Sequence, residues 1–280
     1  MRRYNSFRSI STGTLKWLFL GFFFLYTLLP FLWLILSSFK TNYEFTTAPF
    51  SFPETWQFEN YVKAIRISGL PRLFVNSLIV SVGSTALNLF VSSLGAFVFA
   101  RERFRFQNLL LNIIIAGVLI PIIGLMVPYF KIITTLRLYD TKLGLIVTYA
   151  AINLPISVFL LYGFMKRIPR ELEEAAVIDG CSFRQRYSRV IIPLSRMGLV
   201  TAGIFVFLYS WNDFIYALLL TSSVKARTLQ LGIRFFVSQF FTDYTAMFAA
   251  IVITILPSII IYIIFHDKII HGLTSGSVKE

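Results

Sequence analysis

One carboxylate stands inside an otherwise apolar stretch of this sequence. Asp213 follows Trp211 and Asn212 in the run from Met197 to Leu220. An indole ring can stack on a sugar, and amide and carboxylate groups can bind its hydroxyls. A carboxylate in apolar surroundings is also costly to bury, so it needs a polar partner or a wet cavity. Asp213 can therefore line a path for a polar solute, or it can cap or bridge neighbouring helices, and the sequence leaves both roles open.

Other polar side chains in the apolar runs offer less chemistry. Asn88 and Asn153 are further mid-run amides and join the candidate solute path. Small hydroxyl residues near Asn88 favour close helix packing over contact with a solute; they are Ser81, Ser84, Thr85, Ser92 and Ser93. The runs hold no second carboxylate, histidine or cysteine that would act as acid, base or nucleophile, so we expect no enzyme and no catalytic residue. The single cysteine, Cys181, has no cysteine or histidine near it, so we expect no metal site.

A charged segment, Glu171–Pro193, interrupts the apolar runs and carries the signals of two short helices. Pro169 can open the first helix, because the first turn does not use its missing N–H. Three glutamates follow, where carboxylates meet the positive end of the helix dipole. Gly180 can adopt the positive φ that ends a helix. Ser182 and Gln185 fit a capping box that starts the second helix, and we expect Pro193 to end it.

The second of these helices carries one apolar stripe at helical spacing. The stripe consists of Phe183, Tyr187, Val190 and Ile191. Helices of about ten residues are marginal alone in water, so both need a surface on which to dock. Ala175 and Ala176 make the first helix slim on one side, which suits close approach to another protein. The residues alone do not decide between a partner protein and the chain's own bundle or lipid.

The whole chain has the composition of an integral membrane protein. Of its 280 residues, 56% are hydrophobic and 14% are charged, whereas soluble domains average roughly 25% charged residues. Its apolar runs have lengths of about 20 residues, which is what a helix needs to cross the bilayer core. We expect an all-α protein with a single transmembrane domain over residues 1–280. Six spans are predicted near residues 17–37, 74–100, 109–129, 143–164, 197–220 and 245–265.

The basic residues orient these spans. Of the 26 lysines and arginines, 16 fall in the termini and in the second and fourth connections, and 10 fall in the other connections. Because basic residues collect on the cytoplasmic side, we expect both termini and the loop over residues 165–196 to be cytoplasmic. The net charge of +13 suits contact with anionic membrane lipid. The sequence has no basic stripe interleaved with solvent-facing aromatics, so we expect no nucleic acid partner.

The charged segment resembles the EAA loop of binding-protein-dependent ABC importer permeases. The family pattern is Glu-Ala-Ala, three residues, Gly, nine residues, and Ile-x-Leu-Pro. The matching positions are Glu174, Ala175, Ala176, Asp179, Gly180 and Pro193, with Val190 and Ile192 as conservative departures. Longer fragments, among them FLYSWNDFIYALLLT and the tail GLTSGSVKE, look like the carbohydrate subgroup and are most similar to its MalG-like second permease subunit.

This resemblance implies a six-transmembrane-helix ABC importer permease fold with a cytoplasmic coupling helix. It implies that Glu171, Glu174, Ala175, Ala176, Asp179, Gly180 and Pro193 couple the chain to an ATPase. The implied partners are a second and different permease subunit, two ATP-binding cassette subunits and an extracytoplasmic sugar-binding protein. The implied function is import of a sugar or oligosaccharide by alternating access, in the inner membrane of a prokaryote.

The chain carries no energy source of its own. It contains no Gly-x-x-x-x-Gly-Lys-Ser/Thr phosphate loop, so we expect no cofactor on this chain, with ATP and magnesium bound by the partner ATPase. An ion-coupled secondary carrier is the alternative, but such carriers use several ionisable residues at membrane depth. Here Asp213 is essentially alone. A membrane assembly protein without transport activity is the third possibility.

Overall fold

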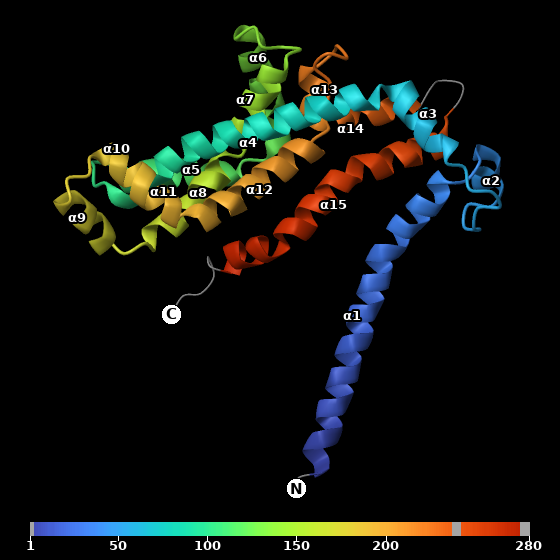
Figure 1. The fold of residues 1–280 in the computed structure, drawn as a ribbon, viewed down its shortest axis with the longest axis horizontal. Helices are drawn as coiled ribbons and strands as arrows, with labels where there is room; N and C mark the ends of the chain where they lie inside the picture. The colour runs from blue at the N-terminus through green and yellow to red at the C-terminus, as the bar shows by residue number, and fades with distance from the viewer. Residues whose placement is uncertain (1–2, 237–241, 275–280) are drawn as a thin grey trace. The chain divides into compact units, whose positions relative to one another are not determined.

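The structure, a computed structural model, describes residues 3–236 and 242–274. Within these residues it contains helices and no strand. The chain groups into two compact units (Figure 1). Unit 1 comprises residues 1–68 and 233–254, and unit 2 comprises residues 69–232 and 255–280. The last residues of the tail fragment, 275–280, lie outside the described residues.

Three helices are each long and apolar enough to cross a membrane. They are α1 (Arg3–Ser38), α4 (Leu70–Arg101) and α15 (Tyr244–Thr274). Pro30 and Pro257 lie inside α1 and α15 without breaking them. Three further pairs of helices meet the same criterion only when each pair is taken together across a bend. By length and composition, the described residues therefore hold 3 spans, or up to 6 if each bent pair is one span.

The first bent pair covers the predicted span over residues 109–129. Its parts are α5 (Gln107–Ala116), the 3₁₀ turns η1 (Gly117–Leu119) and η2 (Ile122–Leu125), and α6 (Met126–Thr135). The two halves meet at 103°. Pro121 lies at the break, and Ile120 before it is extended, with φ −77° and ψ 123°. A residue before proline is pushed out of the helical conformation, which explains why the apolar run bends here.

The second bent pair covers the predicted span over residues 143–164. It consists of α7 (Lys142–Ile152) and α8 (Leu154–Lys166), which meet at 50°. Asn153 lies between them, and Pro155 stands in the first turn of α8. A proline at that position costs no hydrogen bond within the new helix, so the sequence favours a restart at this point.

The third bent pair joins the charged segment to the predicted fifth span. A continuous helical stretch, Phe183–Leu194, comprises α10 (Phe183–Gln185), the π-helix η3 (Arg186–Ile191) and α11 (Ile192–Leu194), and α12 (Arg196–Asn212) leaves it at 77°. The predicted run over residues 197–220 is not one helix. It stops after Asn212, and α13 (Ile215–Leu220) begins beyond a two-residue break.

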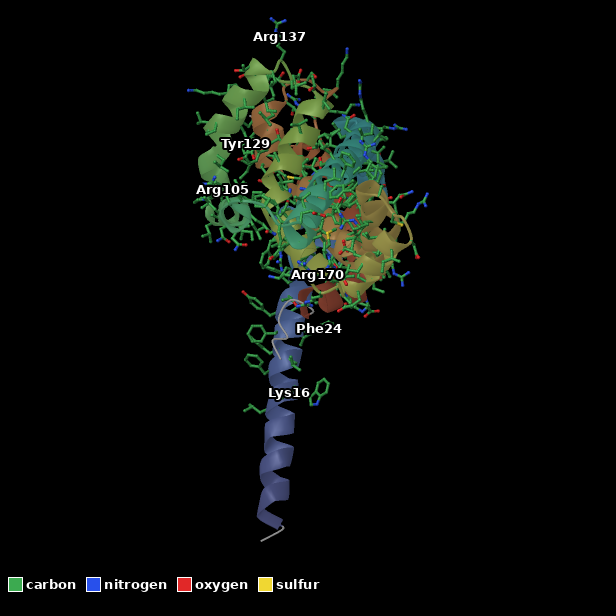
Figure 2. All side chains as sticks on the ribbon, turned by 90° about the vertical axis from the view of Figure 1, so that its left-hand side faces the viewer. Lys16, Phe24, Arg105, Tyr129, Arg137 and Arg170 are labelled. Atoms are coloured by element: carbon green, nitrogen blue, oxygen red, sulfur yellow. The ribbon has the colours of Figure 1, made fainter. Side chains whose placement is uncertain are left out.

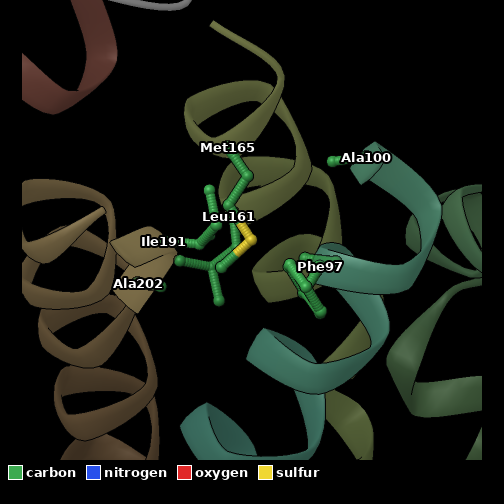
Figure 3. Close-up of a cluster of buried hydrophobic side chains, with 7 residues drawn as sticks. Phe97, Ala100, Leu161, Met165, Ile191 and Ala202 are labelled. Atoms are coloured by element: carbon green, nitrogen blue, oxygen red, sulfur yellow. The ribbon is translucent and has the colours of Figure 1, made fainter. Parts of the chain in front are cut away.

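The core of unit 2 is built around α4. This helix packs along α7, α8 and α12, and the short helix α14 (Leu229–Gly232) also contacts it. Its small hydroxyl residues, Ser81, Ser84, Ser92 and Ser93, are buried, in agreement with the close packing predicted for them. Figure 3 shows one hydrophobic cluster of this core. Its buried members are Ala96, Phe97, Ala100, Leu161, Met165, Ile191 and Ala202.

Unit 1 contains α1, α2 (Asn42–Thr47), α3 (Glu59–Ser68) and the 3₁₀ turn η4 (Ile233–Phe236). No residue in the apolar window of α1 is buried, and Figure 2 shows Phe24 projecting from this helix. Just past its end, the Lys40 ammonium donates hydrogen bonds to the carbonyls of Ala48 (2.9 Å) and Pro49 (3.0 Å). Burial lowers the pKa of Lys40, and the charge of Glu44 partly opposes this shift.

Candidate coupling segment and helix break

The first helix of the charged segment is α9 (Glu171–Ile178). Its first turn carries Glu171, Glu173 and Glu174, as predicted from the helix dipole. The helix begins two residues after Pro169, because the carbonyl of Arg170 accepts the first bonds, from the N–H groups of Glu173 and Glu174. Pro169 therefore precedes the helix instead of opening it.

Gly180 ends α9 in the way the sequence predicts. Its φ is +83°. The N–H of Gly180 donates to the carbonyl of Val177, and the N–H of Cys181 donates to that of Ala176. This pair of bonds is a Schellman motif, in which Asp179 is the C-cap and the glycine after it has the left-handed conformation. No atom lies within 4 Å of the place of an added Cβ at Gly180, so backbone conformation alone, not space, requires glycine.

The second helix begins with the predicted capping box. The N–H of Gln185 donates to Ser182 Oγ (3.4 Å), and the N–H of Ser182 donates to Gln185 Oε1 (2.7 Å). The prediction that Pro193 ends this helix is wrong. Pro193 lies in the first turn of α11, and the stretch ends after Leu194. Because Pro193 lies one residue before the end of the stretch, its missing N–H removes at most one helical hydrogen bond.

The apolar stripe of this second helix docks on the chain's own α4. The ring of Phe97 lies 5.1 Å from that of Phe183 and 5.3 Å from that of Tyr187. The Tyr187 hydroxyl also shares a hydrogen bond of 2.8 Å with that of Ser93. Ile191 is fully buried in the cluster of Figure 3. The docking surface that the sequence left open is therefore, for the second helix, its own bundle.

A network of four charged side chains holds α9 to the same end of α4. Arg101 Nε lies 2.9 Å from Glu173 Oε1, although the Nε–H does not point along a hydrogen bond. Arg186 reaches Glu173 (3.4 Å) and Glu102 (2.9 Å). We call these four residues the charge network. Sequence reasoning missed the charge network, because it counted the arginines only as cytoplasmic charges. One signal was available: Glu173 and Ala176 lie at i and i+3, so they share one face of the helix.

The remaining surface of α9 is exposed. Glu173 and Ala176 are its buried residues, so Ala176 faces the chain's own bundle and not a partner. Ala175 and the charged candidates Glu171, Glu174 and Asp179 are exposed. Large apolar side chains are exposed beside them: Leu172 at 46%, Val177 at 53% and Ile178 at 86%. The helix thus presents a mixed apolar and acidic face, with nothing over it among the described residues.

Asp213 forms the break after α12. Its Oδ2 accepts hydrogen bonds from the N–H groups of Tyr216 (3.0 Å) and Ala217 (3.1 Å), which are first-turn donors of α13. The same oxygen accepts a bond of 2.8 Å from the Tyr149 hydroxyl of α7. The carboxylate therefore restarts a helix and bridges to a neighbour, which is the second of the two roles that the sequence left open.

Its neighbours Trp211 and Asn212 differ in exposure. The Trp211 indole is 1% exposed, lies parallel to Phe207 at 5.8 Å, and meets Phe74 edge-on at 5.4 Å. It has no open face for a sugar in this conformation, contrary to the stacking role predicted for it. Asn212 is exposed, and its Oδ1 accepts a bond from Ser258 of α15 (3.2 Å).

The other candidate amides bind backbone carbonyls in the last turn of α7. Asn88 of α4 donates to the carbonyl of Ala150 (2.8 Å), and Asn153 donates to that of Tyr149 (2.8 Å). The Tyr149 hydroxyl bonds Asp213, so residues in the last turn of α7 contact three predicted path residues. Asn88 and Asn153 are buried, so in this conformation they join helices. Among the described residues, no group of three or more His, Cys, Asp and Glu could hold a metal ion.

Known proteins resemble this chain over most of its length. Residues 90–273 match the family of binding-protein-dependent transport system inner membrane components. A putative ABC transporter permease of Caldicellulosiruptor sp. is 41% identical, over 95% of this chain and 98% of its own length. The trehalose transport system permease protein SugB of Mycobacterium tuberculosis is 37% identical, over 91% and 93%. The sulfoquinovosyl glycerol transport system permease protein SmoH of Agrobacterium fabrum is 36% identical, over 90% and 89%.

The fold also matches a solved structure. A chain of a bacterial ABC transporter involved in the import of the acidic polysaccharide alginate superposes with a TM-score of 0.81, at 23% identity, over 91% of this chain and 95% of that chain. At that identity the match establishes the fold alone. Together with the family match and the relatives, it shows that this chain belongs to the binding-protein-dependent inner membrane components, the multi-pass permease subunits of ABC importers.

Proposed function

We propose that this chain is one half of the permease pair of an importer for a sugar or oligosaccharide. The relatives named above as transporting trehalose and sulfoquinovosyl glycerol support a carbohydrate, and a diacetylchitobiose uptake permease of Streptomyces coelicolor adds a third. Permease subunits of this family are not enzymes themselves, and their importers work with an ATPase and a binding protein. The full assembly that we propose has a second permease chain, two ATP-binding subunits and one external binding protein.

The observation that carries the coupling role is the exposed face of α9. A polar end of the molecule that leaves Leu172, Val177 and Ile178 exposed beside Glu174 is suited to burial by another protein. We propose that the ATPase covers this face, that both termini lie on the same cytoplasmic side, and that ATP and magnesium are held by the ATPase. Alternating access then follows from ATP-driven movement of α9.

The first helix supports the proposal of a second permease chain. None of the apolar window of α1 is buried in this chain, so the whole window is open to lipid or to another subunit. Of the candidate path residues, Asn212 is the exposed amide, and we propose that it faces the solute. Asn88, Asn153, Trp211 and Asp213 are proposed to position the helices around that path.

Reconstitution tests this function. The complete importer is placed in lipid vesicles with its binding protein, and ATP hydrolysis and solute uptake are measured with and without the solute. We expect hydrolysis to rise only with the loaded binding protein, and vesicles lacking this chain serve as the control. Uptake driven by an ion gradient without ATP would instead show a secondary carrier. Calorimetry of the binding protein with candidate sugars then identifies the solute.

A further inference from the structure

Only a small part of the surface of α9 is buried against the rest of unit 2. The helix has eight residues, and an isolated helix of that length is unstable in water. Its buried residues are Glu173 and Ala176, and alanine contributes little apolar area. The position of α9 therefore depends on what holds the Glu173 carboxylate, which is 8% exposed.

Arg101 is the residue at which three helices meet. It is the last residue of α4, and its side chain is 2% exposed. Its guanidinium contacts Glu173 of α9 and donates hydrogen bonds to the carbonyls of Met165 and Ile168, at and just beyond the end of α8. A planar guanidinium has donors in fixed directions, so these contacts fix the angle between the helices as well as their distance.

Arg186 closes the network from the second helix. It lies 2.9 Å from Glu102 and 3.4 Å from Glu173. The charge network thus contains two cations and two anions. A buried ion pair is not more stable than apolar packing of the same volume, because removing the charges from water is costly. The hydrogen bonds of charged groups are directional, so they add a constraint on the angle between the helices that they join.

We propose that Arg101 is a positioning residue that makes α9 move as one body with the cytoplasmic ends of α4 and α8. It acts through Glu173, and it transmits movement between the membrane helices and the surface that meets the ATPase. The two adjacent glutamates have different roles. Glu173 is buried and anchors the helix, while Glu174 is exposed on the face that we assign to the ATPase. This role rests on the proposed function, since it assigns the ATPase to the outer face of α9.

The test uses the complete importer in vesicles and measures solute transported per ATP hydrolysed. We expect Arg101→Gln and Glu173→Gln each to lower this ratio about tenfold, within the range typical of coupling between sites. The double variant should lower it no further, because both changes remove one interaction. Arg101→Lys keeps the charge but cannot reach Glu173 and both carbonyls, so its ratio should be intermediate. Arg103→Gln, at an exposed arginine two residues away, is the matched control.

Hydrogen exchange on the purified complex tests the anchoring without any transport. We expect the amides of α9 to exchange faster in Arg101→Gln, while those of α12 keep their parental rates. A variant with normal transport per ATP and unchanged exchange in α9 overturns the proposal. So does a variant that yields less complex but keeps the parental ratio, since that result shows a purely stabilising role. If the parent chain binds no ATPase and the amides of α9 still exchange faster in Arg101→Gln, the proposed function is refuted and the anchoring stands.

Discussion

The turn at Gly180 and the break at Asp213 both stop one helix and start another, but they satisfy the backbone differently. At Gly180 the partners are local: a Schellman motif ends α9, and the capping box of Ser182 and Gln185 starts the next helix. At Asp213 the local cap is joined by a hydroxyl from a distant helix, Tyr149. Water can complete an imperfect turn at the surface, whereas backbone groups at membrane depth must find partners within the protein.

The neighbourhood of the Asp213 break follows the same rule. The Tyr216 hydroxyl of α13 donates to the carbonyl of Ile122 (2.7 Å), next to the Pro121 bend. A side chain from one broken helix thereby supplies the hydrogen-bond donor for a backbone carbonyl at the break of another. A surface turn can change without disturbing the bundle, but a change at this break is expected to spread to α5, α6 and α7.

The largest expected effect is at the surface turn, on function and not on assembly. Gly180→Val should abolish solute uptake while the complex still forms, because a β-branched residue at positive φ costs about 1–3 kcal/mol and would reorient α9. Gly180→Asn is the matched control, since asparagine tolerates the left-handed region. Uptake assays with equal amounts of complex check this, and normal uptake by the valine variant would show that the turn does not set the position of α9.

A smaller effect, this time on assembly, is expected at the membrane break. Asp213→Ala removes the acceptor of Tyr149 and of two α13 amides, and each buried donor left unsatisfied costs about 1–3 kcal/mol. We expect a lower melting temperature and a lower ratio of this chain to its partner permease. Asp213→Asn keeps an acceptor oxygen and should retain most of both. If both variants assemble normally and only the response to sugar changes, Asp213 lines the path instead.

A substitution at the exposed face of α9 should have a smaller effect, and this effect should be limited to binding of the ATPase. Glu174→Lys should lower recovery of the ATPase about tenfold in detergent pull-downs, equivalent to about 1.4 kcal/mol, without lowering the melting temperature. Glu54→Lys makes the same charge change at an exposed residue of unit 1 and should leave recovery unchanged. Equal recovery for the two variants would mean that α9 rests on lipid.

The smallest effect is expected where the second helix docks on α4. Tyr187→Phe removes the hydroxyl bond to Ser93 but keeps the ring against Phe97. The cost should be about 1 kcal/mol, seen as a small fall in melting temperature with normal uptake. Tyr43→Phe, at an exposed tyrosine, is the control. A loss of uptake at normal stability would show that this hydroxyl pair is part of the coupling path.

The sequence predicted the turn well because its signals are local. Gly180 at positive φ and the capping box were both confirmed, since each depends on residues within a few positions. The start at Pro169 and the end at Pro193 were misplaced by one or two residues, because a proline marks a helix boundary only to within that margin. The break at Asp213 was not predicted, because the hydrophobicity of an apolar run does not show whether its helix is continuous or broken.

The sequence by itself determined that this chain is an all-helical membrane protein of the ABC importer permease family, because hydrophobicity and a long motif are carried by residue order. Only the tertiary structure decided which charged side chains are buried in contacts and which are exposed. It buried Arg101 and Glu173 and left Glu174 exposed, it closed Trp211 between aromatic rings, and it gave Asp213 a hydroxyl partner 64 residues away. The reason is physical: the free energy of a buried charge depends on the groups that surround it in space, and those groups come from helices far apart in the sequence.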